Sequence, residues 1–393
     1  MTKTKIMKGD ALASLKQVPD NSIDSIVTDP PYEIGLLGKS WDSSGIAFSV
    51  ELWKECLRVL KPGGYLLTFG STRTSHRMVV AIEDAGFEIR DTISWVYGSG
   101  MPKSHNVSIA IDKQYGLTGH RGKRASFVGN RSQGQNVEPA KAMPAYVPVS
   151  DEAKRWFGYG SALKPSVEPI CVARKPLDGT IAANIIKYGV GAFNIEVSRV
   201  DDESSTLRRW PANLVHDGSD EVIAGFPQSN GGAYPKNANV SPAALLNGGW
   251  KPLDNDARTE TGSGSASRFF YCAKPSKRER DAGLTRCACA QATPAVSSEE
   301  GTGVCDECGG INVRHPTQKP TTLLRYLVNL CTPAGGTCLD PFMGSGSLAV
   351  ACVLDNFQWL GCELTPAFWP IIEQRVKEAE REVARRAKQG AAA

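Results

Sequence analysis

Residues 23–32, Ile-Asp-Ser-Ile-Val-Thr-Asp-Pro-Pro-Tyr, decide the fold class of this chain. The first five residues are apolar and β-branched enough for a buried strand, and a turn follows at once. Short apolar runs alternate with helical spacing around this stretch. We predict further strands at 3–7, 65–69 and 87–97 and helices at 51–60 and 75–85. Lys61–Gly64 is expected to end the first of these helices. This order predicts a parallel sheet with helices on its faces.

The last eighty residues repeat the pattern. They predict helices at 321–331, at 346–354 and from 366 onward, and strands at 337–339 and 358–362. Residues 100–310 differ, because they are rich in Gly, Asn, Ser and Pro and show weak periodicity. We therefore expect one α/β domain built from residues 1–99 and 311–393, interrupted by a large irregular insert.

The charge of the chain is unevenly distributed. The 393 residues carry a formal net charge of +4, which does not identify a partner. Residues 101–175 hold 12 Lys or Arg against 5 Asp or Glu, and Tyr146, Trp156, Phe157 and Tyr159 lie among them. A basic segment with aromatic side chains is typical of contact with a phosphate backbone. The alternative is a solvated loop region.

Composition excludes several classes of protein. No apolar run approaches the roughly 18 residues that span a bilayer, so we expect no contact with a membrane. The charged segment 1–8 has no apolar core behind it, which argues against a secretory signal and favours a cytoplasmic location. The 11 cysteines are odd in number, which favours reduced thiols or a metal site over a disulfide framework.

Asp29, Pro30, Pro31 and Tyr32 stand directly after the strand expected at 23–27. Ligands of parallel α/β sheets bind beyond the carboxyl ends of the strands, so we expect chemistry here. The carboxylate of Asp29 and the carbonyl of Pro30 can accept the two hydrogens of an aromatic amine and free its lone pair. The prolines stiffen the turn, and Tyr32 can stack on the flat ring. The alternative is a turn that merely ends a strand.

A second motif, Leu339-Asp-Pro-Phe-Met-Gly-Ser-Gly-Ser347, lies between an expected strand and an expected helix. Its glycines let the backbone approach a ligand, and the helix N-terminus offers N–H groups to it. Nineteen residues after Gly344, Glu363 follows the next strand, where an acidic side chain can hold the two hydroxyls of a ribose. These features predict a nucleoside cofactor. The loop lacks the Gly-Lys-Ser/Thr of an ATP-binding loop.

A third motif, His-Pro-Thr-Gln-Lys-Pro at 315–320, opens the helix that precedes this loop. Thr317 and Lys319 could reach a carboxylate. The alternative is a helix-starting turn with a proline in its first position, which is compatible with that role.

The three motifs together resemble those of the amino-group DNA methyltransferases, which methylate N6 of adenine or N4 of cytosine. The resemblance covers about residues 1–110 and 310–372. The catalytic motif comes first and the cofactor loop last, which is similar to the β group of that family. The resemblance implies a Rossmann-like S-adenosylmethionine-dependent methyltransferase fold with permuted motif order, and a target-recognition region at 100–310.

The resemblance also implies the residues of the site. The catalytic residues would be Asp29, Pro30, Pro31 and Tyr32. S-adenosylmethionine would contact Asp10, Ala11, Asp29, Thr317, Lys319, Asp340, Pro341, Phe342, Gly344, Ser345, Gly346, Glu363 and Leu364.

The implied activity is site-specific methylation of adenine N6 in a base flipped out of double-stranded DNA, because Asp rather than Ser stands at position 29. Methylation of cytosine N4 or of RNA is the alternative within enzymes. A zinc-containing DNA-binding protein with an idle cofactor site is the alternative from another class. Segments 95–105, 191–194 and 210–213 look like stretches of phage-type and solitary members, which implies a bacterial or phage-encoded protein that acts on the nucleoid.

Four cysteines, Cys287, Cys289, Cys305 and Cys308, form two close pairs and match a tetrahedral structural zinc site within 287–308. The alternative is four unligated thiols in a loop. The charged C-terminal segment 373–389 predicts a solvated helix, and the alternative is a contact in a homodimer.

Overall fold

The computed structural model describes residues 5–35, 40–100, 104–118, 146–200, 208–229, 264–273 and 318–390. The chain forms two compact units, of which the first comprises Met1–Gly98 with Val167–Ala393 and the second comprises Ser99–Ser166. The strands of the first unit are β1 (Lys5–Lys8), β2 (Ile23–Thr28), β3 (Leu60–Phe69), β4 (Glu88–Val96), β5 (Val167–Arg174), β6 (Leu214–His216), β7 (Gln228–Ser229), β8 (Gly264–Ser265), β9 (Tyr271–Cys272), β10 (Thr337–Asp340) and β11 (Gln358–Glu363). Its helices are α1 (Ala11–Leu15), α2 (Val50–Val59), α3 (Ser75–Asp84), α6 (Ile181–Tyr188), α7 (Asp220–Gly225), α9 (Thr321–Cys331), α10 (Ser347–Leu354) and α11 (Trp369–Gly390).

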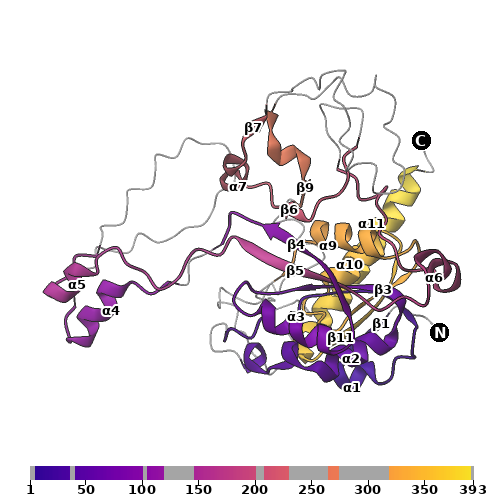
Figure 1. Ribbon diagram of the computed structural model, residues 1–393, viewed down its shortest axis with the longest axis horizontal. Coiled ribbons are helices and arrows are strands. Elements are labelled where there is room, and N and C mark those ends of the chain that lie inside the picture. Colours follow the sequence, from indigo (N-terminus) through magenta and orange to yellow (C-terminus); the bar gives the residue numbers. More distant parts are fainter. Residues whose placement is uncertain are drawn as a thin grey trace, which may run out of the picture. The chain divides into compact units, whose positions relative to one another are not determined.

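Nine of the described strands of the first unit form one large sheet in the order β1-β11-β10-β2-β3-β5-β4-β6-β9 (Figure 1), whereas β7 and β8 pair with each other in a separate sheet. The neighbouring pairs are parallel, except that β5 runs antiparallel to both β3 and β4. The mostly parallel α/β sheet predicted from the sequence is confirmed. Strands from the N-terminal and C-terminal parts of the chain pair directly within this sheet, since β10 lies beside β2.

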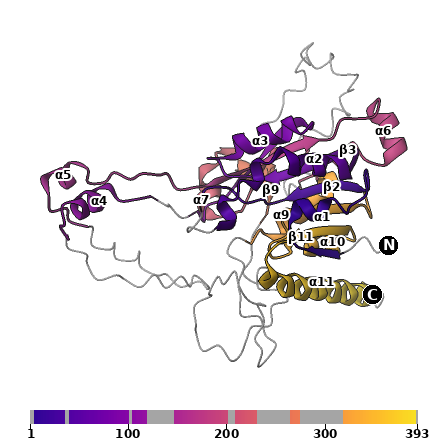
Figure 2. The same ribbon diagram turned by 90° about the horizontal axis from the view of Figure 1, so that it is seen from below.

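Successive residues of the central strands face opposite layers of helices. Ile26 and Leu66 pack with α1, α2 and α3, whereas Val27 and Leu67 pack with α9 and α10. Figure 2 shows α2 and α3 on one side of the sheet and α10 and α11 on the other. All four strand residues are fully buried, as expected for a parallel sheet covered on both faces.

Strand β5 extends the sheet into the segment that the sequence assigned to target recognition. The run Ile170–Ala173 is buried, and it pairs with β3 on one side and β4 on the other. This strand was not predicted from the sequence, because an antiparallel partner that arrives from a distant part of the chain leaves no βαβ pattern. The boundary at residue 100 therefore does not separate sheet from insert: β5, β6 and β9 lie beyond it.

The sequence predicted that the Lys61–Gly64 turn separates a helix from a strand, and this prediction is wrong. Helix α2 ends at Val59, and Leu60 already belongs to β3. The register between β2 and β3 shifts here, because Ile23 pairs with Leu60 and Ser25 pairs with Tyr65. The turn is therefore an irregularity within the paired strand, which glycine at 63, with φ +81°, permits.

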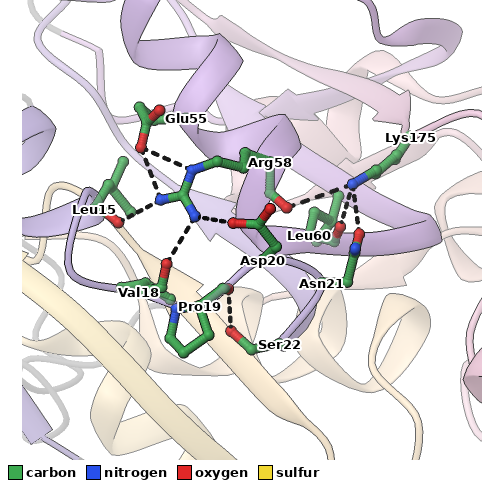
Figure 3. Close-up of polar contacts among 10 residues, drawn as sticks. All are labelled: Leu15, Val18, Pro19, Asp20, Asn21, Ser22, Glu55, Arg58, Leu60 and Lys175. Carbon is green, nitrogen blue, oxygen red and sulfur yellow. Dashed lines mark hydrogen bonds and ion pairs between the residues drawn. The ribbon is translucent and has the colours of Figure 1, made fainter.

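The segment between α1 and β2 is tied to α2 by Arg58 (Figure 3). The guanidinium donates to the carbonyls of Leu15 at 2.8 Å and Val18 at 2.9 Å and contacts the carboxylates of Asp20 and Glu55. Because carbonyls and carboxylates share one planar group with five donors, the start of β2 is fixed relative to the helix beside it.

The described part of the second unit contains α4 (Val107–Gln114) and α5 (Asp151–Arg155). Buried Asp112 joins them by accepting hydrogen bonds from the Tyr146 hydroxyl at 2.7 Å and from the backbone N–H groups of Val149 and Ser150. A buried carboxylate with several donors stabilises the described part of this unit, in which Ala153 is the only buried hydrophobic residue.

Among the described residues, no helix is both long and apolar enough to cross a membrane. Helix α11 is long, and within the segment 373–389, for which the sequence predicts a solvated helix, Arg375 and Ala379 are buried.

Candidate active site

A cavity of about 380 Å³ lies at the carboxyl ends of β2, β10 and β11 and beside the turn after β1. It brings together fourteen of the residues that the sequence analysis singled out, although they come from opposite ends of the chain. They are Asp10, Ala11, Asp29, Pro30, Pro31, Tyr32, Lys319, Asp340, Pro341, Phe342, Gly344, Ser345, Glu363 and Leu364. Both loops therefore face the same space.

Gly346 is the described exception, since it does not line the cavity. It precedes α10 with φ +76°, and a Cβ atom there would lie 2.9 Å from the side chain of Ile372. Its role is to let α10 start close to α11. Thr317 lies outside the described residues, so its expected part in the site stays a prediction.

The loop that carries Asp29 is held from both sides. The Thr74 hydroxyl donates to the carbonyl of Tyr32 at 2.6 Å, and the N–H of Glu33 donates to the buried carboxylate of Asp42 at 3.0 Å. Glu33 has φ +56°, an uncommon conformation for a residue with a side chain. These contacts fix the turn after the two prolines, and neither contact was visible in the sequence.

Lys319, which was expected among the cofactor contacts, reaches the carboxylates of the protein itself. Its Nζ atom lies 2.6 Å from Oδ2 of Asp29, 3.0 Å from the Tyr32 hydroxyl and 3.3 Å from Oε2 of Glu168. The Tyr32 hydroxyl in turn donates to Oε2 of Glu168 at 2.8 Å. The ammonium also lies 5.0 Å from the ring centre of Phe69, a distance typical of a cation–π contact.

Glu168 was missed by the sequence analysis. It is the second residue of β5, pairs with Trp95 of β4 and lines the cavity. Its one sequence signal is an acidic side chain directly before the apolar run Pro169–Ala173. Because the contact with Tyr32 joins residues 136 positions apart, pattern alone could not reveal it.

These groups shift one another's proton affinities. Burial raises the pKa of Asp29, the charge of Lys319 opposes this, and the charge of Glu168 adds to it. Burial lowers the pKa of Lys319, but the charges of Asp29 and Glu168 outweigh burial and raise it. Burial and the same two carboxylates raise the pKa of Tyr32 well above its usual value. At neutral pH Lys319 is therefore an ammonium ion and Tyr32 a neutral hydroxyl donor.

One oxygen of Asp29 is left over. Oδ1 is buried, and no hydrogen-bond partner reaches it from the described residues. Since Asp29 lines the cavity, this oxygen can accept a hydrogen bond from a bound molecule.

The Gly-rich loop is held by two other carboxylates. Asp340 accepts from the Thr28 hydroxyl at 2.6 Å and from the N–H of Phe342 at 2.9 Å. Glu363 accepts from the N–H groups of Gly344 at 2.8 Å and Thr365 at 2.7 Å. Each carboxylate oxygen keeps a further lone pair, so these bonds do not prevent Glu363 from accepting from a ligand.

Burial raises the pKa of both carboxyl groups, to about 7 for Asp340 and to about 7 for Glu363. The hydrogen bonds from the loop oppose this rise without cancelling it. A ligand that donates hydrogen bonds to these groups would favour their ionised form.

Arg375 of α11 supports the same loop and was also missed. Its Nη1 atom donates to the carbonyl of Ser345 at 2.8 Å and to the hydroxyls of Ser345 and Ser347 at 3.0 Å. The arginine follows Ile371 by one helical turn, and both are buried on the same side of α11. That spacing was the available signal, but the charged surroundings favoured a solvated helix.

The turn after β1 supplies the remaining wall. Oδ1 of Asp10 accepts from the N–H of Ala13 at 2.9 Å and caps α1. Asp10 and Ala11 line the cavity beside Glu363. The cavity thus has two ends. One is polar and carries the carboxylate of Asp29 and the carbonyl of Pro30, which together are called the clamp below. The other is the Gly-rich loop at the start of α10.

The four cysteines of the expected zinc site, Cys287, Cys289, Cys305 and Cys308, lie outside the described residues. The site stays a prediction, which metal analysis of the purified protein tests: about one zinc per chain is expected, and its absence would contradict it. The described cysteines, seven in number, are free thiols in or beside the apolar core.

Comparison with known families agrees with the motifs. A family model described as DNA methylase, that of the N6/N4 methyltransferases, matches residues 23–374. The matched segment includes both loops of the cavity, β5 and the first turns of α11.

Individual relatives match shorter segments. The type II methyltransferase M.HpaI of Haemophilus parainfluenzae is 34% identical over 122 residues, which are 30% of this chain and 39% of that protein. M.HindIII of Haemophilus influenzae is 25% identical over 233 residues, which are 48% of this chain and 64% of that protein. The chain therefore aligns with less than two thirds of the length of either relative.

Solved structures of similar extent are more distant in sequence. The cytosine-N4-specific PvuII DNA methyltransferase has a TM-score of 0.43 at 12% identity, over 96% of this chain and 92% of that one. M1.HpyAVI has a TM-score of 0.40 at 14% identity, over 95% and 98%. The assignment accordingly rests on the family model, which covers most of the sequence. The chain belongs to the N6/N4 family of DNA methylases.

Proposed function

We propose that this protein transfers a methyl group from S-adenosylmethionine to the N6 amino group of a specific adenine in double-stranded DNA. The observation that carries the proposal is that the Asp29 loop and the Gly344 loop line one cavity. A methyl transferase of this kind must hold an amine and a methyl donor in contact, and alignment of two reactants supplies much of the rate enhancement.

The residues of the Gly-rich end fit S-adenosylmethionine. Glu363 offers carboxylate oxygens to ribose hydroxyls, Gly344 and Ser345 allow close approach, and Asp10 stands at the wall beside them. When bound, this cofactor would supply an electrophilic methyl group. Asp340 and Phe342 would complete its contacts.

The residues of the other end fit a flat aromatic amine. The unpartnered Oδ1 of Asp29 and the carbonyl of Pro30 would accept its two N–H groups, which favours a tetrahedral nitrogen with an available lone pair. Tyr32 would stack on the ring. A base inside the duplex cannot reach this cavity, so it must be flipped out at a cost of a few kcal/mol.

Asp29 supports adenine as the target, whereas N4 of cytosine presents the same chemistry to the clamp. The experiment is to incubate the purified chain with labelled S-adenosylmethionine and DNA from a host that lacks methylation, and to identify the modified nucleosides by mass spectrometry. N6-methyladenine is expected. N4-methylcytosine would keep the reaction and overturn the base assignment. DNA binding without any methyl transfer would overturn the proposed enzymatic activity and favour a DNA-binding protein with an idle cofactor site.

We further propose that the second unit contacts DNA and belongs to the target-recognition region, and that the first unit, which includes β5 as well as most of residues 1–99 and 311–393, supplies catalysis. Trp156 and Tyr159 pack edge to face at 5.0 Å, yet both are about half exposed, next to Lys154 and Arg155. Exposed aromatic rings beside cations suit the backbone and bases of nucleic acid.

The test is a combined Lys154→Ala and Trp156→Ala variant. We expect DNA affinity to fall about tenfold or more while cofactor affinity is unchanged. Ile186→Ala, which removes an exposed apolar side chain of α6, is the control. Unchanged DNA affinity in the combined variant would contradict the contact.

A further inference from the structure

Asp29, Tyr32, Glu168 and Lys319 form one cluster in the cavity wall. Its second carboxyl group, that of Glu168, is not needed to accept the hydrogens of the target amine. The Lys319 side chain is 10% exposed, Glu168 18% and Asp29 23%, so all three charges are largely withdrawn from water. Two carboxyl groups face one ammonium, with oxygens at 2.6 Å and 3.3 Å from its Nζ atom. Burying a second acidic side chain beside a single cation costs stability, so its position calls for a reason.

The contacts of Lys319 supply that reason. It binds Oδ2 of Asp29 at 2.6 Å, whereas Oδ1 has no partner among the described residues. An ammonium with one anionic partner is free to swing between the two oxygens of that carboxylate. Oε2 of Glu168, at 3.3 Å from Nζ, is a second anionic partner that would oppose such a swing.

Glu168 also fixes the aromatic ring of the clamp. Its Oε2 atom accepts from the Tyr32 hydroxyl at 2.8 Å, while the carbonyl of Tyr32 accepts from Thr74. The ring is therefore held at its tip and at its backbone. A stacking platform that is fixed before the base arrives loses less entropy when the base binds.

We propose that Glu168 is a positioning residue for methyl transfer: its carboxylate holds Lys319 and the Tyr32 hydroxyl, so that Lys319 binds one oxygen of Asp29 and leaves the other to the target amino group. The inference rests on the proposed function. A carboxylate near the target would also favour the transfer itself, because the amino nitrogen gains positive charge when it forms a fourth bond.

The charged and titratable groups around the cluster decide its pH dependence. Asp29 faces Lys319, Glu168, Tyr32 of its own loop and Asp340 of β10, and Glu168 also faces Tyr97 at the end of β4. The charge of Glu168 raises the pKa of Asp29, after the larger effect of burial. Removal of this charge should therefore let Asp29 stay ionised at lower pH.

The experiment compares Glu168→Gln with the wild type under single turnover at saturating cofactor, with unmethylated host DNA as substrate. We expect the maximal rate to fall about tenfold to hundredfold. We expect the acid limb of the pH–rate profile to move to lower pH by about half a unit or more. The affinity for S-adenosylmethionine, measured by calorimetry without DNA, should change less than about twofold.

Two further variants separate positioning from a structural role. Glu88→Gln breaks the 2.6 Å ion pair with Arg174 at the opposite end of β5, so it loosens the same strand without touching the cavity. Its acid limb should stay in place. Glu168→Asp keeps the charge but shortens the side chain, so the rate should fall while the acid limb stays near that of the wild type.

Tyr32→Phe tests the path through the hydroxyl. If Glu168 acts partly through the Tyr32 hydroxyl, the maximal rate of the double variant with Glu168→Gln should fall by less than the product of the two single-variant factors. An acid limb that does not move in Glu168→Gln, or a loss of cofactor affinity as large as the loss of rate, would overturn the positioning role alone. Absence of methyl transfer by the wild type would overturn the proposed function, and this inference with it.

Discussion

The two ends of the cavity hold buried carboxylates in different ways. At the Asp29 end, two carboxylates share the ammonium of Lys319. At the Gly344 end, Asp340 and Glu363 are held by backbone N–H groups and a threonine hydroxyl, and burial raises the pKa of each to about 7. Ion pairing with Lys319 opposes the rise in the pKa of Asp29 that burial causes, whereas the neutral donors at the other end leave two carboxyl groups that titrate near neutral pH. The first end thus suits permanent orientation, and the second suits a ligand whose binding completes the ionisation.

The largest effect is expected at the first end. Asp29→Ala removes the only side-chain acceptor that we assign to the target amine, so methyl transfer should fall about a thousandfold or more. Cofactor affinity should change less than about threefold, because the Gly344 end is untouched. Label incorporation and calorimetry measure the two quantities. Equal losses in both would show that the two ends are not separable.

Gly344→Asp should produce the reverse pattern. Gly344 has φ +53°, its N–H donates to Glu363, and a new carboxylate would stand beside that acid. We expect cofactor affinity to fall about a hundredfold or more. Gly335→Asp is the control, since Gly335 also has positive φ but has open space around it. Normal cofactor affinity in the Gly344 variant, measured by calorimetry, would remove the loop from the cofactor site.

A smaller effect is the pH dependence of cofactor binding. Hydroxyl donors prefer the ionised form of Glu363, so affinity should rise with pH through the pKa of about 7. We expect a gain of about tenfold between pH 6 and pH 8 in the wild type. Glu363→Gln should bind more weakly and with a flatter profile, and any remaining slope would report Asp340. A wild-type affinity that does not vary over this range would contradict the assignment.

The smallest effect concerns the stability of the ligand-free protein. The folded pKa of Glu363, about 7, lies above the ordinary value of 4.5, so the folded protein holds a proton that the unfolded chain releases between these values. Ionisation of Glu363 therefore lowers the free energy of unfolding as pH rises through this window. Gln cannot ionise. The free energy of unfolding of Glu363→Gln, relative to that of the wild type, should therefore be higher at pH 8 than at pH 5 by about 1–3 kcal/mol. Urea unfolding at the two pH values measures the difference, and an equal difference at both would contradict the raised pKa.

Much of this site could be predicted from the sequence. The strand at 23–28 and the turn at Asp29 depend on neighbouring residues, and so does the loop at Gly344 between β10 and α10. Parallel strands then bring these loops to one edge of the sheet, whatever lies between them in the chain.

The supporting residues could not be predicted in the same way. Glu168 and Arg375 act through contacts with residues far away in the chain, and each stands in a segment whose pattern favoured another interpretation. Lys319 was placed in the site together with Asp29 and Tyr32, but its third partner, Glu168, was not, because that contact depends on where β5 enters the sheet. Sequence patterns report which residues line a cleft better than they report what each one touches.

The pairing of β4 with β5 has a consequence for how such a protein diversifies. Val96 and Val167 are register partners, so the chain leaves the catalytic sheet and returns to it at adjacent positions. In the proposed function, target recognition lies between these two positions. Exchange of that part of the chain would then change the DNA sequence that is recognised and would leave the β4–β5 pairing, with Glu168 one residue inside it, in place.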